Sequence, residues 1–173
     1  MGFRVFSTLF PSPTNPKSTD PPMFRGEYPV TLDAKGRLAM PTRYRERLKD
    51  QAGGLLIATV SRSDRCLLIY PMPEWEETEK RLMDLPSFDP ANRRLQILMV
   101  GHAADLEMDA QGRILIPPNL REYASLSRDA VLLGQANRFE LWDEAHWKER
   151  REQLLKVDET IEAMSPELKA LKL

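Results

Sequence analysis

Two stretches of the chain, residues 28–70 and 106–142, place apolar and polar positions in the same order. In each, a polar turn with a glycine joins two short β-forming segments. A proline then starts a short helix, and two more apolar segments follow. The pattern predicts a β-β-α-β-β unit of about 48 residues. The expected elements are strands 28–32, 37–40, 55–60 and 66–70 with helix 42–49 in the first unit, and strands 106–108, 113–116, 131–134 and 139–142 with helix 118–123 in the second.

The two units are copies of one module. Residues 32–46 read LDAKGRLAMPTRYRE and residues 108–122 read MDAQGRILIPPNLRE, and the two segments match position by position at a constant offset. A unit this short has only a marginal core of its own. We therefore expect the first copy and the second copy to bury their apolar faces against each other.

Helix-like sequence follows each unit. Segments 74–85 and 90–101 follow the first copy, and segment 143–155 follows the second. The chain is thus predicted to be an α+β, β-rich protein with appended helices, which are natural partner surfaces. The expected divisions are a disordered proline-rich extension 1–22, a first unit 23–75, a helical connector 76–103, a second unit 104–147 and a charged C-terminal helix or tail 148–173.

The N-terminal segment 1–22 differs in composition from the rest. Five of the twelve residues 11–22 are proline, so we expect a disordered extension, with the working protein beginning near Met23. The apolar part of this segment is too short and too interrupted for a secretory signal. No run of 18 apolar residues occurs, which predicts no membrane span. With one cysteine and two histidines, the chain is expected to hold no disulfide, no metal and no cofactor.

The repeated motifs resemble those of the MraZ family. The resembling segments are MFRGE at 23–27, the two Asp-x-x-x-Arg motifs at 33–37 and 109–113, GRILIP at 112–117 and ELWD at 140–143. One such Asp-x-x-x-Arg motif is weak evidence. Two copies in matched frames, with their flanking Gly, Pro and Trp residues, are specific. The resemblance covers nearly all of the chain beyond the N-terminal segment 1–22.

The resemblance implies a fold and a function. The implied fold is a tandem pair of swapped-hairpin units of the AbrB and SpoVT type around a small barrel-like core. The implied function is that of a transcriptional regulator that represses its own division and cell-wall gene cluster. The implied partners are double-stranded DNA, bound at short G-rich direct repeats, and further copies of the chain in a ring-like homo-oligomer. The implied location is the cytoplasm, in association with the nucleoid.

Charge is unevenly distributed along the chain. The whole sequence has 25 Lys and Arg against 26 Asp and Glu, a net charge of −1 that by itself argues against nucleic acid. Residues 23–70, however, contain nine basic and five acidic residues, a net charge of +4. The first copy is therefore the candidate for a basic surface.

Comparison of the copies separates shared scaffold from residues special to one copy. Positions shared by both are interpreted as structural, with the aspartates taking turn positions and the glycines supplying positive φ. The shared positions interpreted in this way are Asp33, Gly36, Asp109, Gly112 and Arg113. Arg37 and Arg45 also have counterparts in the second copy, but only in the first copy do they lie among other basic residues. Basic positions found only in the first copy are better functional candidates: Lys35 matches Gln111, Arg43 matches Asn119 and Arg47 matches Tyr123.

We expect the hairpin and helix of the first copy to form a DNA-binding face. A two-stranded β-ribbon fits the major groove, and arginine pairs with guanine through two hydrogen bonds. Arg37, at the ribbon turn, is the expected base-reading residue. The residues expected to contact the phosphate backbone are Lys35, Arg43, Arg45, Arg47 and Arg25.

Two other functions compete with DNA binding. The chain contains no recognisable catalytic motif. Cys66 lies in the apolar segment CLLIY, which favours a buried, structural cysteine over a nucleophile, so we expect that the protein is not an enzyme. The second alternative is an AbrB-type interaction module that neutralises a partner in the manner of an antitoxin, using residues 156–173, with DNA binding secondary. Steep salt dependence would favour the DNA binder.

Overall fold

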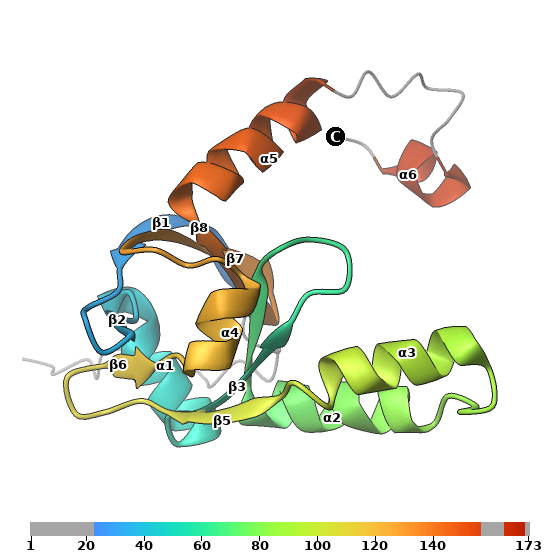
Figure 1. Ribbon diagram of the computed structural model, residues 1–173, viewed down its shortest axis with the longest axis horizontal. Coiled ribbons are helices and arrows are strands. Elements are labelled where there is room, and N and C mark those ends of the chain that lie inside the picture. The colour runs from blue at the N-terminus through green and yellow to red at the C-terminus, as the bar shows by residue number, and fades with distance from the viewer. Residues whose placement is uncertain (1–22, 157–164, 172–173) are drawn as a thin grey trace, which may run out of the picture.

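The computed structural model describes residues 23–156 and 165–171 (Figure 1). The strands are β1 (Phe24–Thr31), β2 (Arg37–Ala39), β3 (Leu55–Val60), β4 (Leu67–Pro71), β5 (Ala104–Glu107), β6 (Arg113–Leu115), β7 (Asp129–Ala136) and β8 (Arg138–Asp143). The helices are α1 (Thr42–Ala52), α2 (Met72–Met83), α3 (Pro90–Met99), α4 (Pro118–Tyr123), α5 (Glu144–Lys156) and α6 (Pro166–Ala170). The predicted mixed α+β, strand-rich class is confirmed.

Proline and glycine set the limits of α1. Pro41 precedes the helix in an extended conformation, with φ −52° and ψ 131°. At the other end Gly53 has φ +60°, a left-handed conformation, and its N–H donates to the carbonyl of Lys49 at 2.9 Å. Both residues are visible signals in the sequence, and α1 has the predicted start and ends before the predicted glycine pair.

The strands of the two copies interleave in one six-stranded antiparallel sheet, in the order β1-β7-β8-β4-β3-β5. The first strand of the first copy, β1, pairs with β7 of the second copy along its whole length. In turn β5, the first strand of the second copy, pairs with β3 of the first. Each copy therefore supplies a strand that completes the sheet of the other. Described strands β1 and β5 are the two edges of this sheet, so the barrel-like closure implied by the resemblance is not confirmed.

The strands that flank each polar turn do not form an ordinary hairpin. Between β1 and β2 the ladder is reduced to one bridge, Leu32 with Leu38. Instead β2 pairs with β6 of the other copy, in the register Arg37 with Leu115, Leu38 with Ile114 and Ala39 with Arg113. We call this two-stranded unit, residues 37–39 and 113–115, the ribbon.

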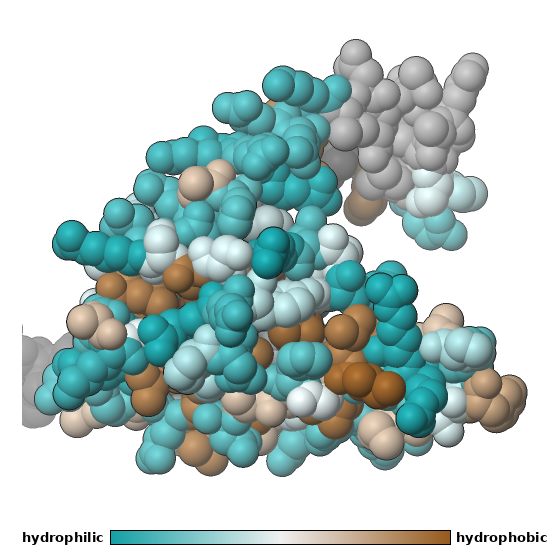
Figure 2. Space-filling view, in the orientation of Figure 1, coloured by the Kyte–Doolittle hydropathy of each residue, from teal (hydrophilic) through white to brown (hydrophobic). Residues whose placement is uncertain are grey.

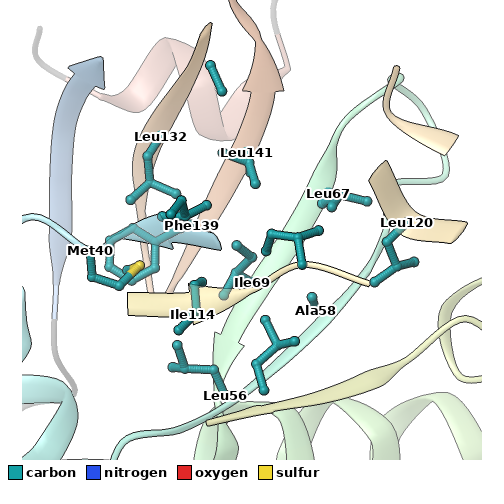
Figure 3. Close-up of a cluster of buried hydrophobic side chains, with 14 of the residues drawn as sticks. Met40, Leu56, Ala58, Leu67, Ile69, Ile114, Leu120, Leu132, Phe139 and Leu141 are labelled. Atoms are coloured by element: carbon teal, nitrogen blue, oxygen red, sulfur yellow. The ribbon is translucent and has the colours of Figure 1, made fainter. Parts of the chain in front are cut away.

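One hydrophobic core lies between the ribbon, the short helices and the large sheet (Figure 3). Side chains from both copies meet there: Leu56 and Ile69 come from the first copy, and Ile114, Leu120 and Phe139 from the second, all with no exposed surface. The two copies thus bury their apolar faces against each other, as the sequence predicts.

Two smaller apolar clusters cover the other surface of the sheet. In one, Trp75 of α2 packs with Tyr70 and with Met99 of α3. In the other, Cys66 and Trp142 lie buried, and Trp147 of α5 packs against Trp142 with ring centroids 5.5 Å apart. Figure 2 shows mostly hydrophilic side chains over the rest of α5. Within the described residues, none of the helices is long and apolar enough to span a bilayer.

Some predicted segments lie outside the described residues. These are the proline-rich extension 1–22 and, within the C-terminal segment 148–173, residues 157–164 and 172–173. The described strands also differ at their ends from the prediction: β1 begins at Phe24 rather than 28, because Phe24 packs into the core and the strand follows β7 along its whole length.

Candidate nucleic-acid interface

The turn between β1 and β2 is built around the carboxylate of Asp33. Its Oδ1 accepts the backbone N–H groups of Lys35 and Arg37, both at 2.9 Å, and its Oδ2 accepts Nε of Arg37 at 2.7 Å. Gly36, with φ +84°, donates its N–H to the Asp33 carbonyl. The hydrogen bond from the Arg37 backbone, followed by that from its side chain, holds the pKa of Asp33 below its ordinary value despite some desolvation. The carboxylate therefore fixes the turn and orients the arginine.

The turn between β5 and β6 repeats this arrangement. Oδ1 of Asp109 accepts the backbone N–H groups of Gln111 at 2.9 Å and Arg113 at 2.8 Å, and Oδ2 accepts Nε of Arg113 at 2.8 Å. The pKa of Asp109 is lowered for the same reason, with the backbone N–H of Arg113 the largest cause. Because the two turns match atom for atom, the Asp-x-x-x-Arg motif acts here as one structural device used twice.

Each turn is covered by an arginine from the helix of the other copy. The side chain of Arg121, in α4, packs over Gly36, where an added Cβ atom would lie 2.6 Å from its Cζ atom. The side chain of Arg45, in α1, packs over Gly112 and would be in contact with a Cβ atom there as well. Nε of Arg45 also donates to the carbonyl of Met40 at 2.8 Å. Positive φ thus favours glycine at both turns, and an added Cβ atom would also displace the arginine side chain that packs there.

The ribbon presents one face to the core and one to solvent. Leu38 and Ile114 point inward and are at most 1% exposed. Since side chains alternate along a strand, their neighbours in the ribbon point outward. The side chains of Arg37 and Arg113 are 33% and 36% exposed on this outer face. Both arginines therefore lie on one accessible surface, although they belong to different copies.

A second group of cations gathers where α1 meets the start of β1. Nη1 of Arg43 donates to the Tyr28 hydroxyl at 2.7 Å, and its guanidinium lies 5.1 Å from the ring centroid of Tyr44. Nη1 of Arg47 donates to the Met23 carbonyl at 3.4 Å. The backbone of Arg25 joins the same group through the Tyr44 hydroxyl, which donates to its carbonyl.

The structure thus divides the predicted DNA-contacting residues into three places. Lys35 and Arg37 lie at the first turn, and Arg25, Arg43 and Arg47 lie together at the β1–α1 contact. Arg45 is half-buried against the second turn. Sequence comparison does not separate Arg45 from Arg37, because both have a counterpart in the second copy, Arg121 and Arg113.

Residues of the second copy also belong to this surface. Arg113 shares the outer face of the ribbon, which the antiparallel pairing of β2 with β6 brings about. Arg128 lies beside the first turn, where its carbonyl accepts the N–H of Leu32 at 2.8 Å. A hollow of about 660 Å³ next to this turn is lined by Asp33, Arg121 and Arg128 among others. The repeat is the signal for Arg113, whereas no local motif points to Arg128.

Comparison with known proteins identifies the family. The family model described as "MraZ protein, putative antitoxin-like" matches residues 23–98 and again residues 99–164. The chain belongs to the MraZ family. The two matches correspond to the two sequence copies, and the resemblance carried by the paired Asp-x-x-x-Arg motifs is confirmed.

Several MraZ relatives match over most of their length. A protein of Halorhodospira halophila is 50% identical over 152 residues, which are 87% of this chain and all of the relative. One from Coxiella burnetii is 49% identical over 156 residues, again 87% of this chain and all of the relative. One from Pseudomonas putida is 56% identical over 125 residues, 72% of this chain and 83% of the relative. All three relatives are named transcriptional regulator MraZ.

The MraZ relatives carry the names of regulators, not of enzymes. Cys66, the one cysteine in the chain, is 1% exposed in an apolar cluster. Burial, with a smaller contribution from Glu140, raises the pKa of its thiol. The predicted buried, structural cysteine is thus confirmed in its placement.

Proposed function

We propose that this MraZ-family chain is a transcriptional regulator that binds double-stranded DNA through the outer face of the ribbon. The observation that carries the proposal is the pair Arg37 and Arg113, each oriented by an aspartate and exposed on one two-stranded surface. A two-stranded antiparallel ribbon has the width of the major groove. The relatives' names support regulation of transcription as the purpose of that binding.

The geometry of the arginine pair suits base recognition. Arg37 lies opposite Leu115 and Arg113 lies opposite Ala39, so the two arginines are diagonal neighbours. Such neighbours are about 7–8 Å apart, close to two base steps of roughly 3.4 Å. The Asp33 carboxylate accepts a hydrogen bond from Nε of Arg37. Within the described residues, the two terminal nitrogens of Arg37 make no hydrogen bond. Those nitrogens are the donors that arginine uses toward guanine O6 and N7.

The remaining cations have the placement of phosphate contacts. We propose that Lys35 and Arg128, exposed beside the first turn, and the group of Arg25, Arg43 and Arg47 reach the DNA backbone and set the register. Arg45 is the weakest candidate, because its Nε is bonded to a carbonyl and its stem packs on the second turn. This placement modifies the expectation that the first copy alone forms the DNA-binding face.

The proposal extends to assembly and target. One ribbon with few cations binds weakly, whereas several linked copies on repeated sites gain affinity through effective concentration. We infer that the chain acts as a homo-oligomer, ring-like as in the family resemblance, on G-rich direct repeats upstream of its own gene cluster. Repression of that cluster, in the cytoplasm at the nucleoid, is the corresponding role.

The experiment is footprinting and affinity measurement on the DNA upstream of the chain's own gene. Arg37→Ala is expected to lose about 1–3 kcal/mol of binding free energy and to relax the sequence preference at one or two positions. Arg37→Lys, which keeps the charge but not the paired donors, is expected to lose the preference while retaining nonspecific binding. Unchanged affinity and preference in both variants would refute the base-reading role.

Arg81→Ala is the matched control for Arg37→Ala. Arg81 also bonds an acidic residue four positions earlier, Glu77, at 2.5 Å on an exposed surface. It lies in α2, away from the ribbon (Figure 1). Its replacement should leave DNA affinity unchanged, so a similar loss in both variants would indicate nonspecific damage instead of a lost base contact.

The antitoxin-like interaction module is kept as the second candidate, because the matching family model carries that description. A salt series separates the two functions. A DNA-binding regulator shows affinity that falls steeply with salt and a strong preference for one promoter. A pure interaction module shows neither property.

A further inference from the structure

One exposed leucine stands out on the ribbon. Leu115 is 52% exposed, whereas its neighbours in sequence, Ile114 and Ile116, have no exposed surface. The alternation of strand side chains places Leu115 outward, on the same face as the two arginines. Leu115 therefore shares its face with two cations, and contact with an apolar group there would take its exposed surface out of water.

The surroundings of Leu115 indicate the kind of partner. It lies directly opposite Arg37 and, on its own strand, two residues beyond Arg113. Both cations and the nearby Lys35 attract a polyanion. The partner of this face must therefore combine negative charge with a small apolar group that reaches Leu115. In the major groove of DNA that group is the C5-methyl of thymine.

We propose that Leu115 reads a thymine by contact with its C5-methyl group, next to the base read by Arg37. This inference rests on the proposed function, since it assigns a specificity-determining residue to the same DNA-binding face. Arg37 fixes the ribbon over one base, and Leu115, on the neighbouring strand of the ribbon, then reaches an adjacent one. The contact removes the methyl group and the exposed part of the leucine from water together.

The position also gives the ribbon a direction. Arg37 and Arg113 are related by the pseudo-symmetry of the two copies, and so are Leu115 and Ala39. Because alanine is too short to make the same contact, the two halves of the face read different bases. Operator symmetry mirrors protein symmetry. A ribbon with unlike halves therefore selects a non-palindromic site and binds it in one orientation, as direct repeats require.

The test replaces single thymines by deoxyuridine across the footprinted site, which removes only the methyl group. For the unmodified protein we expect about a fourfold loss of affinity at one or two positions, the effect of one methyl group left in water. Leu115→Ala should bind the thymine site more weakly and should not distinguish thymine from uracil at those positions. The salt dependence of binding should not change, since no charge is removed.

Leu55→Ala is the matched control, because Leu55 is another strand leucine, 42% exposed, at the start of β3 outside the ribbon. It should keep full thymine discrimination. The melting temperature of each variant shows whether the fold is retained.

Two results would overturn the proposal. Either the unmodified protein is indifferent to uracil at every position of a site it still binds specifically, or Leu115→Ala keeps the same discrimination. Failure of the proposed function looks different, because the chain would then show no specific binding to any upstream DNA.

Discussion

At the level of single residues, the stability of the fold depends on the ionised carboxyl groups of the two aspartates that build the turns. The folded state lowers the pKa of Asp33 and Asp109 below 3.8, mainly through backbone N–H donors of Arg37 and Arg113. A lowered carboxyl pKa means that the folded state favours the ionised form. The resulting stability is present above the ordinary pKa and is lost as the pH falls through the folded value.

Replacement of Asp109 by Asn tests this linkage. The amide keeps an acceptor oxygen for the backbone donors but loses the charge that holds Arg113. We expect a lower melting temperature than wild type at pH 7, with a smaller further decrease as the pH falls from about 5 to 3. Thermal melts across this range measure both, and parallel curves for the two proteins would contradict the linkage.

Gly36 tests the close packing of Arg121 on the first turn. A Cβ atom at Gly36 would lie 2.6 Å from Cζ of Arg121, and the substituted residue would have to adopt a φ of +84°. Gly53→Ala is the matched control, since φ is +60° there but nothing lies within 4 Å. We expect each substitution to cost about 1–3 kcal/mol of unfolding free energy for the backbone conformation, with a further loss at Gly36.

The double variant Gly36→Ala/Arg121→Ala separates the two causes. Removal of the arginine side chain should restore the part of the loss that comes from the clash, which denaturant unfolding would show as non-additivity of the two single changes. Additive effects would mean that Arg121 does not press on the turn.

At the level of elements, the sequence predicts what local residues decide. The prolines and glycines at the ends of α1 place that helix, and the turn residues 33–36 place the first break. Pairing is decided by residues far apart. The sequence of residues 28–40 is typical of a hairpin, yet β1 pairs with β7 and β2 pairs with β6. A pairing partner in the other copy leaves no mark on a local pattern.

The candidate site shows the same limit. Comparison of the copies identifies Lys35, Arg43 and Arg47 as candidate cations. All three are exposed, Lys35 at the first turn and the two arginines at the β1–α1 contact. Whether Arg45 faces solvent or the second turn depends on which copy covers which turn. Likewise, the exposure of Leu115 on the ribbon follows only from the register between β2 and β6. The sequence predicts which residues are candidate DNA contacts, but it does not predict which residues of the other copy lie against each of them.

At the level of the whole molecule, the two copies form one folding unit. Within the described residues, every strand of the first copy pairs with a strand of the second, and only β3 and β4 also pair with each other. Without that copy, β1 and β2 keep only the single bridge between Leu32 and Leu38, and β3 and β4 each lose one neighbour. The remaining two-stranded hairpin is marginal in water. The core side chains of Figure 3 would likewise lose about half of their partners.

A fragment of residues 23–85 is therefore expected to be unfolded as a monomer, whereas a mixture with residues 90–156 should recover the native sheet. The cut falls in the loop 86–89, whose residues are exposed, so it removes little packing. Circular dichroism and amide NMR dispersion of each fragment, alone and mixed, measure the recovery. Because the copies share a pattern, self-association at high concentration can supply the missing strands, and a dilution series resolves this. A cooperatively folded monomer of residues 23–85 would show that the interleaved strands are dispensable.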